Sequence, residues 1–215
     1  MLRETLNQIR TPIQQTRKKS ILFTASAFVC GIALGIVAKW LDNLSLDSAI
    51  WWHRLIEMLD LGNFFSDIAI WLLTALLIAV FSVSASRAAL NVFLFFAGMC
   101  VAYHVYTLLF SGFNPMSYMM IWYGMTLCSP LLAVLCWYAK GSGTIALILD
   151  IAIIAVFTLA CFAMGFFYVD CRGILYLLVF AGAAAALYQN PKQLLLSLPI
   201  GFLLAFLLSP VWPYH

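Results

Sequence analysis

Long apolar runs separated by short polar stretches constrain this chain more than any motif it contains. A helix that crosses a bilayer needs about 20 mostly apolar residues, with a range of about 17–25. We expect such helices over residues 20–38, 67–85, 88–110, 117–138, 144–167, 173–188 and 193–209. The last two are short and joined by polar residues 189–193, so they form either a tilted pair or a re-entrant hairpin. The predicted fold class is an all-α, polytopic transmembrane helix bundle of about seven spans, with six as the alternative.

The composition excludes a water-soluble fold. Hydrophobic residues make up 65% of the 215 residues and charged residues only 9%, whereas soluble domains have about 45–50% and about 25%. With a mean hydropathy of +1.03, the surplus apolar surface needs the lipid bilayer as its solvent. We expect residues 20–215 to form a single transmembrane domain. Basic residues beyond residue 19 are few and scattered, so no nucleic-acid partner is expected.

The basic residues predict which side of the membrane each loop occupies, because cytoplasmic loops collect lysine and arginine. With a cytoplasmic N-terminus, eight of the eleven basic residues lie inside, and only Lys39, Arg54 and Arg172 lie outside. We therefore predict a multi-pass protein of the plasma membrane, with residues 1–19 as a basic cytoplasmic segment. The apolar run that follows is long enough to span, so we expect a retained helix rather than a cleaved signal peptide.

The longest loop, residues 39–66, contains a helical pattern of its own. Apolar residues recur at helical spacing between charged ones over about 47–60, and Trp51 and Trp52 suit a membrane–water boundary. We predict an external amphipathic helix over residues 47–60 that lies on the interface. It serves either as an anchor or as a lid over an external cavity.

The first apolar run carries a face of small residues. Ala27, Gly31 and Gly35 recur at four-residue intervals and therefore lie on one side of the predicted helix. Small residues let helices approach closely in lipid. The face either packs within the bundle or docks a partner protein.

This pattern, with the small size, the basic N-terminus and the high apolar content, resembles the S components of energy-coupling factor vitamin transporters. Those proteins use an Ala-x-x-x-Ala face on their first helix to dock the coupling subunit. The resemblance implies that Ala27 and Gly31 are docking residues. The family has six spans where about seven are predicted here, and no ligand-contact signature matches. The chain also looks like small polytopic membrane proteins of Gram-positive bacteria.

Polar residues inside the apolar runs are the best indicators of function, because burying them in lipid is costly. His104 lies in the outer half of the third run, and a matching polar face follows on the fourth. If these faces meet, they form an aromatic-rich pocket that opens outward. The expected ligand-binding residues are His104, Thr107, Tyr118, Trp122, Thr126 and Asp170. The alternative is a histidine that makes only structural hydrogen bonds.

Asp150 is the other ionisable residue well within an apolar run. It lies in the inner part of the fifth run, and its expected partners are Arg87 or Asn91 near the inner end of the third. These residues form either an ion pair that holds two helices together or a site for a coupling ion or a proton.

No catalytic, phosphate-binding or dinucleotide motif occurs in the sequence, and we predict no enzyme activity, no cofactor and no metal site. The six cysteines show no CxxC spacing. The leading prediction is therefore a small-molecule binding or transport subunit, whose partners are the lipid bilayer, a small ligand and a protein docked on the first helix. The alternative is a non-catalytic accessory or scaffold subunit of a larger membrane complex.

Overall fold

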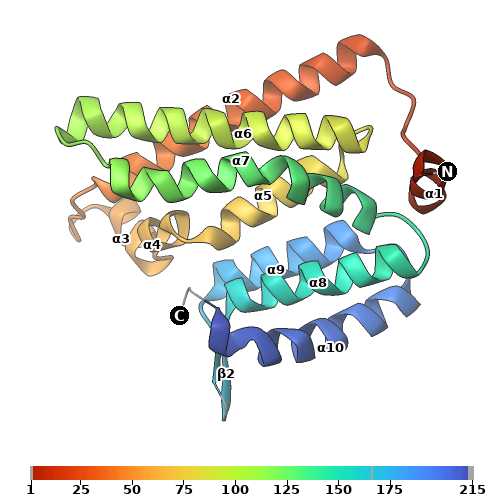
Figure 1. Ribbon diagram of the computed structural model, residues 1–215. Helices are drawn as coiled ribbons and strands as arrows, with labels where there is room; N and C mark the ends of the chain where they lie inside the picture. The colour runs from red at the N-terminus through yellow and green to blue at the C-terminus, as the bar shows by residue number, and fades with distance from the viewer. Residues whose placement is uncertain (1, 166, 213–215) are drawn as a thin grey trace.

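The computed structural model describes residues 2–165 and 167–212 and confirms the predicted helical bundle (Figure 1). The apolar runs become the α-helices α2 (Arg17–Asp42), α5 (Ile68–Val80), α6 (Ala85–Tyr106), α7 (Met116–Ala139), α8 (Thr144–Cys161), α9 (Ile174–Leu187) and α10 (Pro191–Leu208). A π-helical turn, η1 (Thr107–Ser111), extends α6, and a 3₁₀ turn, η2 (Ser209–Val211), follows α10. A short helix, α1 (Leu2–Ile9), precedes α2.

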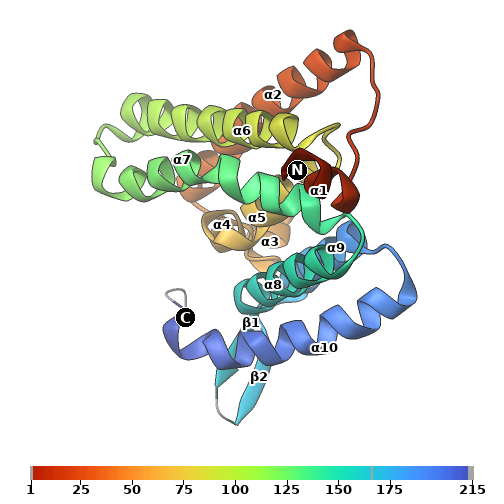
Figure 2. The same ribbon diagram turned by 45° about the vertical axis from the view of Figure 1, so that its right-hand side comes forward.

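Successive apolar helices run in opposite directions between the same two ends of the bundle (Figures 1 and 2). One end, here called the basic end, holds α1 and the loops that precede α6, α8 and α10. Its bases are Arg10, Arg17, Lys18, Lys19, Arg87, Lys140 and Lys192. The other end, here called the acidic end, holds most of the carboxylates: Asp42, Asp47, Glu57, Asp60, Asp67 and Asp170. The fold therefore separates charge along its long axis.

Five of the described helices are long and apolar enough to cross a membrane, as expected of an integral membrane protein. They are α2, α6 with its π-helical turn, α7, α8, and α10 with its 3₁₀ turn. The helices α5 and α9 have 13 and 14 residues. At 1.5 Å per residue each is about 20 Å long, which is less than the hydrocarbon thickness of about 30 Å.

The fifth predicted helix, over residues 144–167, is too long at its C-terminal end. The helix α8 stops at Cys161, and an antiparallel hairpin follows, formed by β1 (Phe162–Gly165) and β2 (Tyr168–Cys171). Phe162 pairs with Cys171 and Gly165 pairs with Tyr168. An apolar run of this length has no periodicity that separates strand from helix, so hydropathy extended the helix through the hairpin. Nη1 of Arg172 lies 2.9 Å from Oδ2 of Asp67, which ties the end of the hairpin to the start of α5.

The predicted interfacial helix is shorter than residues 47–60 and is followed by a second one. The helix α3 spans Trp51–Met58, and α4 spans Leu61–Ser66. Asp60 separates them in a left-handed conformation with φ 50°. Because an L-residue interrupts a right-handed helix at such an angle, the amphipathic pattern cannot continue as one helix.

The bundle has two layers, one of α2, α5, α6 and α7 and one of α8, α9 and α10 (Figure 2). In the first layer, α2 packs most closely against α6. A Cβ atom on Gly31 would collide with the carbonyl oxygen of Phe95, and one on Gly35 would lie 2.5 Å from that of Met99. Ala27, in the same row, is 5% exposed. The small face therefore packs within the bundle, against α6 of the same chain, which is the first of the two alternatives that the sequence left open.

Candidate functional site

Asp150 is the most buried carboxylate among the residues whose burial is described, with 1% of its surface exposed. Its Oδ2 accepts a hydrogen bond of 2.6 Å from Nε2 of Gln193, which reaches across from α10. Ser197, one turn further along α10 and fully buried, interacts with the same carboxyl group. A carboxylate and two neutral polar side chains therefore meet inside an otherwise apolar helix pair.

The expected partners of Asp150 lie elsewhere, which corrects that part of the prediction. Asn91 on α6 accepts a hydrogen bond from Thr24 and donates one to Ser82. Arg87 stands near the start of the same helix, at the basic end, and makes no ion pair with Asp150. The reason is the order of the helices: α8 packs mainly on α10, and α7 and α5 separate it from α6.

The close packing of α10 on α8 follows from a four-residue spacing in the sequence. Gln193, Ser197, Gly201 and Ala205 occupy one face of α10 and are small or polar throughout. A Cβ atom on Gly201 would lie 2.6 Å from Cγ2 of Ile154, so only glycine allows this approach. This spacing is the signal in the sequence that identifies Gln193 and Ser197, and the sequence prediction missed it.

A polar pocket opens at the basic end and leads to this group. Its cavity volume is about 200 Å³, and it lies between the α7–α8 loop and the α9–α10 loop. The wall consists of Gly141, Ser142, Gly143, Ala146, Leu147, Gln189, Asn190 and Gln193. Gln193 is common to both features, because it lines the pocket and also contacts Asp150. We call this hollow the basic-end pocket.

Hydrogen bonds to helix ends hold the walls of the basic-end pocket in place. Nζ of Lys140 donates to the carbonyl oxygens of Ala186 and Tyr188, over 2.6 and 2.5 Å, and Gln189 donates to that of Ala139. Burial lowers the pKa of Lys140 below its ordinary value, and the nearby Arg10 lowers it further, whereas Asp150 raises it. These contacts satisfy carbonyl groups that the ends of α7 and α9 leave free.

The N-terminal segment packs against the same end of the bundle. Arg10 donates from Nη1 to the carbonyl oxygen of Trp137 and from Nη2 to that of Val80, over 2.8 and 2.9 Å. Its guanidinium carbon also lies 4.5 Å from the centre of the Trp137 ring. The carbonyl oxygen of Ile9 accepts a hydrogen bond of 2.8 Å from the backbone of Ser142, which is a pocket residue. The segment therefore fastens α5 and α7 together and supports one wall of the pocket.

The predicted site around His104 is assembled in part. The two ring nitrogens of His104 lie 2.5 Å from the hydroxyl of Tyr123 and 3.1 Å from Oδ1 of Asn114. Thr107 donates to the carbonyl oxygen of Tyr103, and Thr126 donates to that of Trp122, each within its own helix. The hydroxyl of Thr126 also lies 3.4 Å from Sγ of Cys100 on α6, so both hydroxyls already have protein partners.

Tyr118 and Trp122 line a hollow between α5, α6 and α7. Its cavity volume is about 10 Å³, and about 10–15 Å³ is the least that holds one water molecule. The space beside Tyr118 and Trp122 is therefore almost completely filled by side chains. No large ligand fits there without a movement of the helices.

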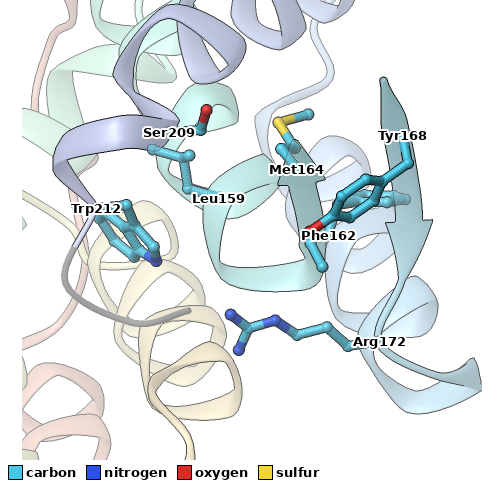
Figure 3. A pocket seen from close by; sticks show the side chains of 8 residues that line it. Leu159, Phe162, Met164, Tyr168, Arg172, Ser209 and Trp212 are labelled. Atoms are coloured by element: carbon cyan, nitrogen blue, oxygen red, sulfur yellow. The ribbon is translucent and has the colours of Figure 1, made fainter. Parts of the chain in front are cut away.

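Asp170 lies apart from these residues, on the exposed strand β2 of the hairpin (Figure 1). The hairpin, the end of α8 and η2 surround a separate hollow of about 90 Å³. Figure 3 shows Ser209 and Trp212 on one side of it and Met164, Tyr168 and Arg172 on the other. The structure thus places Asp170 beside neither His104 nor Asp150.

Among the described residues, no group of three or more histidine, cysteine, aspartate or glutamate side chains has a geometry that could hold a metal ion. The polar side chains of the basic-end pocket, together with Asp150 and Ser197, offer neutral oxygen and nitrogen atoms and one carboxyl group. Comparison of the chain with protein-family models, with curated protein sequences and with solved structures finds no match.

Proposed function

We propose that the protein is a small-molecule binding or transport subunit of the plasma membrane, and that its solute site is the basic-end pocket. The observation that carries the proposal is the position of Gln193, which lines the pocket and contacts the buried Asp150. A buried ionisable group is costly inside a membrane domain and is the usual mark of a substrate or ion pathway. The pocket gives that group an opening at the end of the bundle.

The lining favours a small polar solute. Ser142, Gln189, Asn190 and Gln193 offer hydroxyl and amide groups, and none of the described residues that line the pocket is charged. Its volume is about 200 Å³. Sites for drug-sized ligands are larger, at about 300–1,000 Å³. A neutral or zwitterionic solute smaller than a drug-sized molecule fits these properties.

The charge distribution supports an orientation with the basic end in the cytoplasm. Lysine and arginine concentrate in the loops of that end, including the α7–α8 and α9–α10 loops that form the pocket. Cytoplasmic loops carry such an excess. The solute would then meet the pocket from the cytoplasmic side.

Native mass spectrometry of the gently purified chain, with and without a bulky residue at Ser142, tests the proposal. Ser142 is exposed at the pocket wall, so Ser142→Trp fills the opening without burying a new group. We expect a small molecule to accompany the wild-type chain and to be lost from Ser142→Trp. The control Ser48→Trp places the same ring in an exposed turn at the acidic end and should retain the molecule. A molecule retained equally by both variants, or a chain that carries none, contradicts the proposal.

A further inference from the structure

Three buried oxygen atoms lie together between α8 and α10, and none of them makes a hydrogen bond of good geometry to another protein atom, although Ser197 approaches the carboxyl group of Asp150. They are Oδ1 of Asp150, Oε1 of Gln193 and Oγ of Ser197. Asp150 is 1% exposed and Ser197 is fully buried. Buried polar atoms are nearly always paired, because leaving one unpaired costs most of its hydration energy. One such atom on a carboxyl group and two beside it indicate a shared ligand.

The chemistry of these atoms selects the kind of ligand. All three are hard oxygen donors, which suit alkali and alkaline-earth cations better than zinc or copper. The group contains one carboxylate and therefore compensates one positive charge. A divalent cation would need further carboxylates, and none lies among the described residues of this group. A monovalent cation matches both the donor atoms and the charge.

Lys140 does not fill the place of this ligand. Lys140 is close enough to influence Asp150 electrostatically, but the two form no ion pair. Its ammonium group donates instead to the carbonyl oxygens of Ala186 and Tyr188. A proton on Asp150 is the competing occupant of this place, and a protein that responds to pH but not to Na⁺ would identify it.

We propose that Asp150, Gln193 and Ser197 form a binding site for a monovalent metal cation of the size of Na⁺. Gln193 separates this site from the basic-end pocket, so a cation reaches the carboxylate from there, and water or solute completes its coordination. The role of the cation in coupling rests on the proposed function, because only a solute in the same pocket would sense it. Occupation of the cation site itself requires no solute.

Equilibrium binding of radioactive Na⁺ to the purified full-length chain in detergent tests the site directly. We expect saturable binding to a single site. Thermal unfolding should shift upward as NaCl replaces choline chloride at constant ionic strength, because a ligand that binds the folded state stabilises it. The absence of saturable binding, or an unfolding midpoint that responds to pH but not to Na⁺, overturns the proposal.

Substitutions of the proposed ligands show which side chains bind Na⁺. Asp150→Asn keeps the size of the side chain and should weaken Na⁺ binding by about 10–100-fold or more, by analogy with the loss of metal-site groups. Ser197→Ala removes one oxygen and should weaken it several-fold, which provides a milder second variant if Asp150→Asn folds poorly. The control Glu57→Gln removes an exposed carboxylate at the acidic end and should leave binding unchanged. Equal binding by wild type and by both site variants overturns the assignment.

The solute assay separates this inference from the proposed function. If the chain binds Na⁺ but carries no small molecule, the result contradicts only the proposed solute site. Conversely, a solute that is lost from Ser142→Trp but binds equally in Na⁺ and in choline contradicts only the coupling role. A solute that binds more weakly in choline and to Asp150→Asn supports both.

Discussion

Gln193 on α10 and Asp150 on α8 are joined by a hydrogen bond of 2.6 Å, although 43 residues separate them in the chain. This contact connects a polar pocket at the surface to the most buried carboxylate among the residues whose burial is described. It also fixes the start of α10 against α8, and further along α10 Gly201 allows the two helices to approach closely. The packing of two helices and the construction of a polar site are therefore consequences of the same face of α10.

The contact between α2 and α6 predicts a sharp difference between two glycines. A Cβ atom on Gly31 would lie 2.9 Å from the carbonyl carbon of Phe95 and closer still to its oxygen, whereas one on Gly124 would meet nothing within 4 Å. Gly31→Ala should lower the free energy of unfolding by about 1–3 kcal/mol, because backbone atoms must move. Gly124→Ala should leave it unchanged or raise it by up to about 1 kcal/mol through helix propensity. Equilibrium unfolding in mixed micelles measures both, and equal effects would contradict the packing.

The helices themselves follow from hydropathy, and the sequence predicts them well. Each predicted apolar run overlaps one long observed helix, because a stretch without water must satisfy its backbone hydrogen bonds internally. The predicted helix boundaries are wrong where a different structure also satisfies the backbone hydrogen bonds. At Phe162 the chain becomes extended, with φ −123° and ψ 138°, and the hairpin pairs its own backbone. The apolar residues there look the same in either conformation.

The site could be predicted only in part. The cost of burying a charge drew attention to Asp150, which is buried within α8. Periodicity, however, shows which residues share a face and not which helices are neighbours. Asp150 was therefore expected to meet Arg87 or Asn91, whereas α10 supplies Gln193. The row Gln193, Ser197, Gly201 and Ala205 carries the missing information, since a small and polar face on an apolar helix has to be buried against a neighbour.

Arg10 is expected to contribute strongly to stability although it lies outside the apolar helices. Arg10→Ala leaves the carbonyl oxygens of Val80 and Trp137 without their donor and removes the contact with the Trp137 ring. The loss should be about 2–3 kcal/mol, as for hydrogen bonds to charged groups. Lys18→Ala, which removes an exposed base near the same end, is the control and should change little. The unfolding transition of the full-length chain measures both.

The lowered pKa of Lys140 predicts that its contribution to the free energy of unfolding rises at alkaline pH. Burial and Arg10 lower its pKa in the folded protein below the ordinary value of 10.5. Between the lowered pKa and 10.5 the unfolded chain holds more protons than the folded one, so the stability contributed by this group rises with pH. The free energy of unfolding of wild type, minus that of Lys140→Met, should therefore increase across this range.

A second substitution checks the cause of that rise. Asp150 raises the pKa of Lys140, so its removal in Asp150→Asn should move the start of the rise to lower pH. A difference between wild type and Lys140→Met that stays flat or falls with pH would show that Lys140 is not desolvated. Unfolding curves recorded at a series of alkaline pH values provide the measurement.

His104→Ala distinguishes a structural histidine from a ligand-binding one. The substitution removes the contacts with Tyr123 and Asn114, and we expect a loss of stability of about 1–3 kcal/mol. Na⁺ binding and the accompanying small molecule should remain, because both are assigned to the opposite end of the bundle. Loss of the small molecule with an intact fold would instead place the solute site beside Tyr118 and Trp122, as the sequence first suggested.

The proposed orientation predicts which exposed positions react from outside the cell. Ser142 lies at the basic end and Glu57 at the acidic end, and both side chains are exposed. In a chain whose six native cysteines are replaced, Glu57→Cys should react with a membrane-impermeant maleimide on intact cells. Ser142→Cys should react only after the membrane is permeabilised, because bases gather in loops that stay in the cytoplasm. The reverse pattern would put the pocket on the outer surface, so that its solute would be met from outside while the geometry around Asp150 stayed the same.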